Sequence, residues 1–236
     1  MVYNGLENWL NGASFGKYLT ELEKTFLRQK LANLRFGTIL QIGLPSWQFK
    51  NMFAQESQYI IQNRYPHPET MLIADETALP WKEQSIDTVI WPHGLDTLAN
   101  TEHAIAEIVK ILVPGGYLLL TGLNKSGYWR FFQQRHTLLQ SCHPRTVSTI
   151  VAKMQNYHLF MTEGQFIGYG LPKFYGAKHH TIELMGNRWW PHLAAIYGLV
   201  LVKRSIPLTM LTSQAETRQT ASKITNVKPA LLQYAI

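Results

Sequence analysis

The chain has 236 residues, 46% of them hydrophobic and 16% charged, which fits one globular domain with a sizeable buried core. The formal net charge of +7 favours association with nucleic acid or another acidic partner, but it says nothing about the fold. Cys142 is the only cysteine, so an internal disulfide and a thiolate metal cluster within one chain are excluded.

No run of the sequence reaches the ~18 apolar residues that a membrane-spanning helix needs. The amino terminus carries the polar residues Asn4, Glu7 and Asn8 and lacks the basic-then-apolar order of a signal peptide. We therefore expect a cytoplasmic protein without a membrane span.

Residues 1–35 are predicted to be helical. Leu19, Leu22 and Phe26 recur at near-helical spacing and give this segment an apolar face. We expect that face to pack against a sheet.

Three predicted strands follow, at residues 38–42, 58–62 and 71–74. The first leads into the loop Gly43-Leu44-Pro45-Ser46-Trp47, and the third delivers Asp75. Pro66 and Pro68 keep the segment between the second and third strands out of helix.

The stretch from Met71 to Asn124 determines the predicted architecture. Residues 86–91 and 117–121 are short apolar runs typical of strands buried on both faces, with an amphipathic helix between them that Pro114-Gly115-Gly116 ends. Strand, helix and strand in this order form a right-handed crossover in a parallel sheet. Ligands of such sheets bind beyond the carboxyl ends of the strands, so residues 92–94 and 122–124 indicate the site.

In the last third of the chain, helices are predicted over residues 128–139 and 145–157. Strands are predicted over residues 159–169 and 196–204, the second of them antiparallel. An insertion rich in glycine and proline spans residues 168–191, and the sequence after Pro207 is polar. His179, His180 and Glu183 lack the spacing of a metal site, so we expect no metal.

The order Asp75-x-x-x-Leu79-Pro80-Trp81, Ser85-Ile86-Asp87, a His after the strand, and Leu112-Val113-Pro114-Gly115-Gly116 resembles the middle of a class I S-adenosylmethionine-dependent methyltransferase of the type 11 kind. Gly122-Leu123-Asn124 and Gly186-Asn187-Arg188-Trp189-Trp190-Pro191 resemble the YafS-like branch of that family. The resemblance covers roughly residues 10–208.

This resemblance implies a doubly wound α/β fold with a mostly parallel, seven-stranded, Rossmann-like sheet. The implied organisation is a helical segment at 1–35, a methyltransferase-like domain at 36–207 and a flexible basic tail at 208–236. The implied function is methyl transfer from S-adenosylmethionine to an acceptor that the sequence does not specify.

The resemblance also implies the cofactor site. Asp75 would accept a hydrogen bond from the adenine amino group, with Glu76 and Thr77 beside it, and Leu79 would form part of an apolar wall near the ring. His93 lies where the family places residues near the transferred methyl, and a neutral imidazole there could take a proton from the acceptor. The complete set of expected cofactor-binding residues is Gly43, Leu44, Gln62, Asp75, Glu76, Thr77, Leu79 and His93.

Two departures from the family pattern favour a second hypothesis. The loop after the first strand keeps only Gly43 of the usual glycines, and Pro45 removes a backbone N–H. Gln62 and Asn63 stand where the wider family has an acid that hydrogen-bonds both ribose hydroxyls. The alternative is a catalytically silent binding module that contacts nucleic acid or an acidic partner through its basic tail and Arg188-Trp189-Trp190.

Overall fold

The computed structural model of the chain describes residues 2–34, 37–53, 57–128, 141–170 and 191–204. The chain divides into two units, Met1–Ser205 and Ile206–Ile236, and all described residues belong to the first. The helix predicted over residues 128–139, most of the 168–191 insertion and the tail after Pro207 lie outside the described residues, and the predicted domain limits stay predictions.

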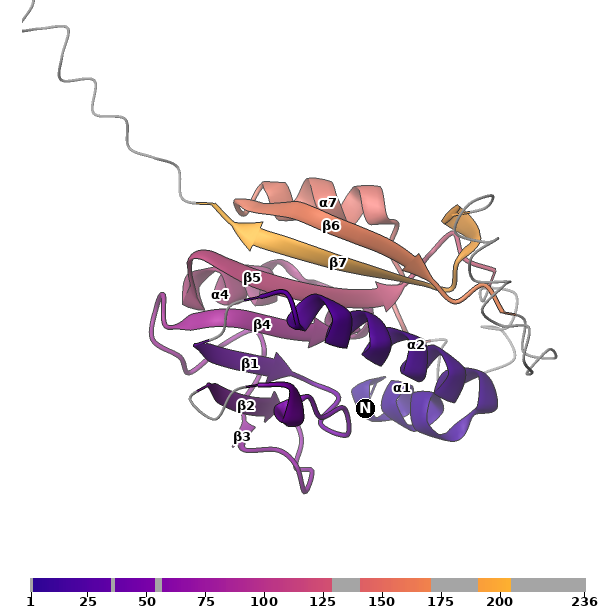
Figure 1. Cartoon of the computed structure of the whole chain (residues 1–236), viewed down its shortest axis with the longest axis horizontal. Coiled ribbons are helices and arrows are strands. Elements are labelled where there is room, and N and C mark those ends of the chain that lie inside the picture. Colours follow the sequence, from indigo (N-terminus) through magenta and orange to yellow (C-terminus); the bar gives the residue numbers. More distant parts are fainter. Residues whose placement is uncertain (1, 35–36, 54–56, 129–140, 171–190, 205–236) are drawn as a thin grey trace, which may run out of the picture. The chain divides into compact units, whose positions relative to one another are not determined.

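The described residues form a seven-stranded sheet in the order β3-β2-β1-β4-β5-β7-β6 (Figure 1). Strand β7 is antiparallel to both of its neighbours, whereas the other pairs are parallel. The predicted mostly parallel, seven-stranded Rossmann-like sheet is therefore confirmed. The strands are β1 Thr38–Ile42, β2 Gln58–Asn63, β3 Leu72–Ile73, β4 Ile86–Pro92, β5 Leu112–Leu123, β6 Leu159–Ile167 and β7 Ile196–Lys203.

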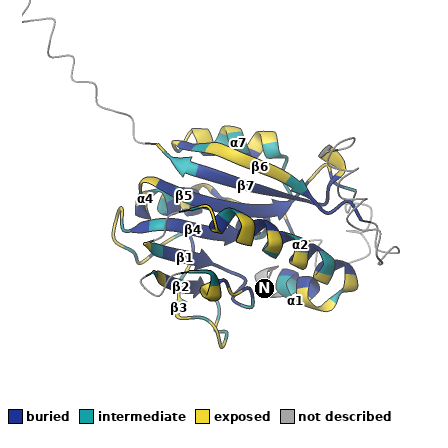
Figure 2. Cartoon of the chain, in the orientation of Figure 1, coloured by how far each residue is buried: buried dark blue, intermediate teal, exposed yellow. Residues whose placement is uncertain are grey.

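The central strands are apolar because helices cover the sheet on both faces (Figures 1 and 2). Helix α2 Ser14–Leu31 crosses one face, with α1 Val2–Gly12 packed against it, and α4 Glu102–Ile111 and α7 Val147–Gln155 cover the other. Successive strand residues alternate between the two cores, so Ile39 packs in the cluster with α2 while Leu40 packs in the cluster with α4.

The amino-terminal helical segment consists of two helices, with Ala13 in an extended conformation between them. Gly16 allows the helices to touch, since a Cβ there would overlap the backbone carbonyl oxygen of Trp9. The predicted apolar face is buried against the sheet through Leu19, Phe26 and Leu27.

Two elements differ from the prediction. Strand β5 begins at Leu112, directly after α4, because Leu112 pairs with Ile86 before a register shift sets the rest of the ladder. Strand β3 is only Leu72–Ile73, shorter than the predicted 71–74. Among the described residues between β1 and β4, the one helical turn is η1 Lys50–Met52, so α1, α2 and loops cover that end of the sheet.

Candidate functional site at the carboxyl edge of the sheet

The parallel strands β1, β2, β3 and β4 all end at the same edge of the sheet, and the residues that follow them meet there (Figure 1). In register, Ile42 lies beside Gln62, and Gln62 lies beside Leu72. The topology therefore brings most of the predicted cofactor residues to one edge although they are spread along some fifty positions of the chain.

The turn after β1 closes on itself. Gly43 and Leu44 both have left-handed backbones, with φ of 79° and 45°. The Gly43 N–H donates to the carbonyl of Gln62 at 2.9 Å, and the buried Gln41 amide donates to the carbonyls of Gly43 and Leu44 at 3.1 and 2.9 Å. A left-handed leucine costs about 1–3 kcal/mol, which these hydrogen bonds offset.

Trp47 fills the space next to this turn. Its side chain is fully buried, and its backbone N–H donates to the Leu44 carbonyl at 2.8 Å. Leu44 is fully buried as well. The loop therefore presents packed side chains where a glycine-rich loop would present bare backbone.

The polar groups at the end of β2 are occupied by the protein itself. The fully buried Gln62 amide oxygen accepts a hydrogen bond from the Trp81 indole at 2.8 Å, and its NH₂ group lies 3.5 Å from the Ala74 carbonyl. Asn63 donates to the Tyr65 carbonyl at 3.0 Å. These amides hold β3 and the following loop in place.

Asp75, which follows β3, stabilises a turn and forms an ion pair with Arg64. One carboxylate oxygen accepts from the Arg64 guanidinium at 2.7 Å and from the backbone N–H and hydroxyl of Thr77 at 2.9 and 2.7 Å. Partial burial raises the pKa of Asp75, but the hydrogen bonds from Thr77 and Arg64 outweigh it and hold the pKa below its usual value. The side chain is 45% exposed.

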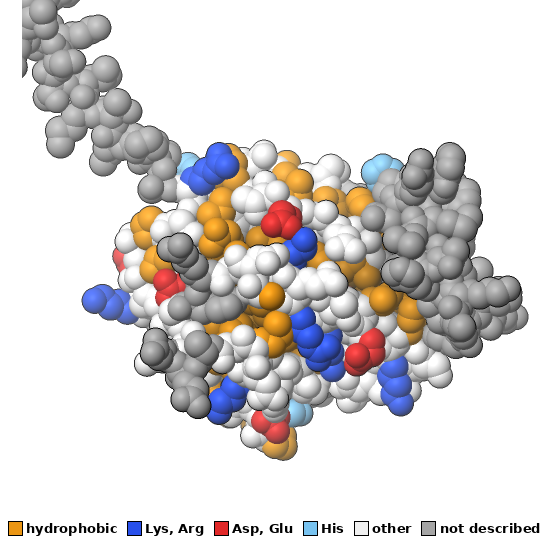
Figure 3. Space-filling view, viewed as in Figure 1, with side chains coloured by type: hydrophobic (Ala, Val, Ile, Leu, Met, Phe, Trp, Pro, Cys, Tyr) orange, Lys and Arg blue, Asp and Glu red, His pale blue; other side chains and the backbone are white. Residues whose placement is uncertain are grey.

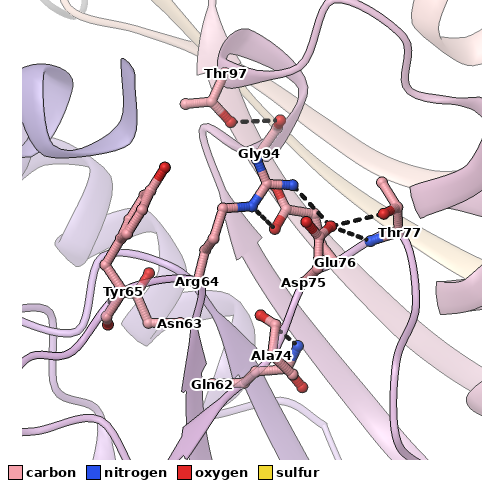
Figure 4. Close-up of polar contacts among 10 residues, drawn as sticks. All are labelled: Gln62, Asn63, Arg64, Tyr65, Ala74, Asp75, Glu76, Thr77, Gly94 and Thr97. Atoms are coloured by element: carbon pink, nitrogen blue, oxygen red, sulfur yellow. Dashed lines mark hydrogen bonds and ion pairs between the residues drawn. The ribbon is translucent and has the colours of Figure 1, made fainter. Parts of the chain in front are cut away.

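Glu76, the next residue, is buried. Its carboxylate is 2% exposed, and Oε2 lies 3.4 Å from Nε of Arg64 (Figure 4). The other oxygen, Oε1, has no hydrogen-bond partner among the described residues. Burial raises the pKa of Glu76, and a hydrogen bond from the residue's own backbone N–H and the charge of Arg64 partly counteract that rise. Leu79, three positions further along the chain, is buried, and its backbone N–H donates to Oε2 of Glu107 at 3.1 Å.

His93 lies at the end of β4 with a left-handed backbone (φ 54°) and a fully buried side chain. Its Nδ1 is 2.8 Å from Oδ2 of Asp96 in the short helix α3 Gly94–Thr97, and its Nε2 is 3.0 Å from Oε1 of Glu23 in α2. Burial lowers the pKa of His93, but Glu23 and Asp96 together raise it by more, so that the net pKa is about 10. The two carboxylates favour the charged imidazole, in which Nδ1 donates to Asp96 and Nε2 donates to Glu23, while burial also raises the pKa of Asp96.

A cationic imidazole with both nitrogens engaged has no lone pair to accept a proton from a substrate. The expected catalytic role of His93 stays a prediction, and the geometry describes a tie between α2 and the end of β4. Sequence reasoning did not predict that Glu23 and Asp96 contact His93, nor the short helix α3. The available signal was an acid at position 23 within the apolar face of the helix, between Leu19 and Phe26.

None of the helices in the described part of the chain is long and apolar enough to cross a bilayer. Within those same residues, no three His, Cys, Asp or Glu side chains are grouped so that they could hold a metal ion. His179, His180 and Glu183 lie outside the described residues.

Comparisons with known proteins place this geometry in context. The family model described as "Methyltransferase domain" matches residues 50–120, from η1 to the middle of β5. A search of curated proteins found no match.

Solved structures match over most of the chain. A methyltransferase of Thermotoga maritima that depends on S-adenosylmethionine has a TM-score of 0.59 at 13% identity, covering 86% of this chain and 100% of that chain. A chain of the Haloferax volcanii complex between the Trm112 activator and a methyltransferase has a TM-score of 0.58 at 15% identity, covering 85% and 98%. An Archaeoglobus fulgidus methyltransferase has a TM-score of 0.56 at 11% identity, covering 78% and 94%.

At these identities the structures establish the fold, while the family model establishes the domain type over residues 50–120. The chain therefore has the fold of the class I S-adenosylmethionine-dependent methyltransferases, and its residues 50–120 match the methyltransferase family model.

Proposed function

We propose that the protein binds S-adenosylmethionine at the carboxyl edge of β1–β4 and transfers its methyl group to an acceptor that is not yet identified. The observation that carries this proposal is the carboxylate pair Asp75 and Glu76 with Arg64 at the end of β3, inside the segment that matches the family model. Membership of the YafS-like branch is also proposed, on the sequence motifs at 122–124 and 186–191. A cytoplasmic location rests on the sequence alone.

The residues present fit the adenosine part of this cofactor. Glu76 Oε1 is a buried acceptor without a partner among the described residues, which matches the hydrogen-bond donors of a nucleoside. Gly43, Asp75 and Leu79 would form the rest of this part of the site.

At the methionine end, Gly43 is the one glycine of the turn after β1, and the Gly43 N–H is already bonded to Gln62. When bound, the cofactor supplies an electrophilic methyl on a sulfonium. The protein's contribution is then to hold the acceptor in line and to exclude water, which needs no general base.

The test is to measure binding of S-adenosylmethionine and S-adenosylhomocysteine to the purified full chain, by calorimetry and by thermal melting. Ligand at 100 times its Kd stabilises the folded state by about 2.7 kcal/mol. For a protein of this size that raises Tm by roughly 5–10 °C. An unchanged Tm at millimolar ligand, with no heat of binding, would contradict the proposal.

The closed turn after β1 favours a second candidate. Trp47 and Leu44 are fully buried there, and Gln41 bonds both carbonyls of the turn. A chain that kept the fold but lost the cofactor would serve as a binding module, with nucleic acid or an acidic protein as partner through residues 208–236. Lys and Arg side chains on the described part of the face in Figure 3 are scattered, so the tail is the better candidate contact.

A further inference from the structure

We propose that Glu76 is the carboxylate that accepts the ribose hydroxyls of a bound nucleoside, in place of an acid at the end of β2. This inference rests on the proposed function and specifies which side chain recognises the cofactor. It follows from how the four polar residues at this edge use their hydrogen-bonding groups.

The end of β2 offers no carboxylate, and its amides are already bonded. Gln62 is fully buried, and its oxygen accepts from Trp81. Asn63 donates to the Tyr65 carbonyl. A ribose anchor on β2 would have to break contacts that hold β3 and the Trp81 loop in place.

Asp75 is also occupied. Its Oδ1 already accepts three hydrogen bonds, one from Arg64 and two from Thr77. Its low pKa reflects those bonds, and its side chain is nearly half exposed. Asp75 therefore uses Oδ1 to shape the turn and bind Arg64, and its half-exposed side chain leaves the other oxygen open to water. Glu76 is the acid whose oxygen Oε1 is buried away from water and has no partner in another described residue.

Glu76 combines burial, charge and a free acceptor. Arg64 approaches Oε2 at 3.4 Å and so fixes the orientation of the carboxylate, while Oε1 lacks a partner among the described residues (Figure 4). A buried carboxylate oxygen without a donor is costly, so a ligand that supplies hydroxyl donors there is stabilised.

The topology places Glu76 close to the usual ribose anchor. Ile73 pairs with Asn63 across the β2–β3 ladder, so the residues that follow both strands leave the sheet side by side. Arg64 and Glu76, which follow Asn63 and Ile73, are in contact. A carboxylate carried by β3 can therefore take the position that β2 leaves without an acid.

The experiment compares two ligands on three proteins by calorimetry. The ligands are S-adenosylhomocysteine and its 2′,3′-dideoxy analogue, and the proteins are the wild type, Glu76→Gln and Glu83→Gln. Glu83 is 69% exposed and lies outside this edge, so its substitution matches the charge change without touching the site. The melting temperature of each protein without ligand shows that it is folded.

We expect the wild type to bind S-adenosylhomocysteine at least tenfold more tightly than the dideoxy analogue. Glu76→Gln should lose roughly 10- to 100-fold in affinity for S-adenosylhomocysteine, the usual effect of removing a hydrogen bond to a charged group. It should bind the dideoxy analogue nearly as the wild type does, so that the discrimination disappears. Glu83→Gln should retain both affinities.

Four results would overturn the inference. Equal binding of both ligands by the wild type would show that the protein does not recognise the ribose hydroxyls. This result does not depend on whether any variant folds. Unchanged affinity in Glu76→Gln, or equal weakening for both ligands as expected of an adenine contact, would reject the ribose assignment while leaving the proposed function intact. A wild type that binds neither ligand would instead reject the proposed function, and this inference with it.

Discussion

Among the residues that the structure describes, His93, Glu23 and Asp96 form a buried triad of ionisable groups. All three side chains are fully buried, and Asp96 Oδ2 also accepts the backbone N–H of Leu123 at 2.8 Å. One imidazolium between two carboxylates joins α2, α3 and the ends of β4 and β5. Removing one partner of such a buried set leaves uncompensated charge, which typically costs 3–5 kcal/mol, so this triad determines whether the amino-terminal helices stay on the sheet.

We predict that His93→Gln lowers the free energy of unfolding by about 3–5 kcal/mol at neutral pH, measured by urea denaturation. The wild type should also lose stability as pH rises. The folded pKa of His93 is raised to about 10 from an unfolded value near 6.5, so its contribution is complete below about pH 6.5 and disappears as pH approaches 10. From about pH 8 to pH 9.5 the free energy of unfolding should fall by up to about 1.4 kcal/mol per pH unit.

The control for this prediction is His103→Gln, the same substitution at an exposed position of α4. It should stay within about 0.5 kcal/mol of the wild type and keep the pH dependence. The groups around His93 are Glu23 from α2, Asp96 from α3 and, facing Asp96, Tyr197 from β7, whose pKa burial raises well above its usual value. Tyr197 and Cys142, which also interacts with Asp96, are present in both variants. Burial raises the pKa of Asp96 and His93 lowers it, so the difference in slope between wild type and His93→Gln reports the titration of His93 together with its coupling to Asp96. Equal slopes would refute the assignment.

At this scale the sequence identifies the neighbourhood but not the contacts. The family resemblance predicted that Asp75 and Leu79 line the site, and the place of His93 after a buried strand put it at the carboxyl edge of the sheet, where β4 ends. It could not show that Asp75 is bonded to Arg64, or that His93 is bonded to an acid 70 positions away. Such contacts depend on which loop reaches which helix, and no local periodicity records that.

At the scale of elements, α1 and α2 supply apolar side chains to the core, as crossover helices usually do in a doubly wound sheet. Only η1 provides a helical turn in the described connections between β1 and β4, and the core on that face is built from Leu6, Leu10, Leu19 and Leu27. The helices must lie close together to do this, and their contact passes over Gly16. The packing of α1 on α2 is therefore part of the sheet's core.

We predict that Gly16→Ala destabilises the protein by about 1–3 kcal/mol, because the added methyl overlaps the Trp9 carbonyl and forces the two helices apart. Gly12→Ala is the matched control, since a Cβ at Gly12 meets nothing within 4 Å. The control should be neutral or slightly stabilising, as expected for replacing glycine in a helix. Both are measured by urea denaturation, and equal stabilities of the two variants would show that α1 and α2 do not depend on this contact.

The elements most accurately predicted from sequence are those with both faces covered. Strands β1, β4 and β7 lie where their apolar patterns place them, because burial on two sides requires continuous hydrophobic runs. Helix α4 was also placed correctly, from the helical spacing of its one buried face. The start of β5 was missed, because Pro114-Gly115-Gly116 has the composition of a loop although it continues the strand, with Gly115 at φ 80°. The break at Ala13 was also missed, although the turn-forming pair Asn11-Gly12 directly precedes it.

For the whole molecule, the class I fold could be predicted because motif order fixes the topology of parallel strands. Whether the site accepts a nucleoside could not, because that depends on Trp47 and Gln41 packing beneath the first turn. The fold therefore does not determine the function here. The binding-module alternative is tested by changing the tail and not the sheet.

If residues 208–236 contact nucleic acid, their removal should reduce the salt dependence of binding to duplex DNA. The segment has three cations, Arg218, Lys223 and Lys228, so the slope of log K against log salt should change by at most about 2.7, at about 0.9 for each neutralised phosphate. Replacing the three by Gln should reproduce the truncation, which separates charge from tail length. A slope that stays unaltered in both proteins, measured by fluorescence anisotropy from 50 to roughly 200 mM salt, would exclude the tail as the contact. Nucleic-acid binding by the domain itself would then need cations on the folded surface, and in Figure 3 these are dispersed on the face that is seen.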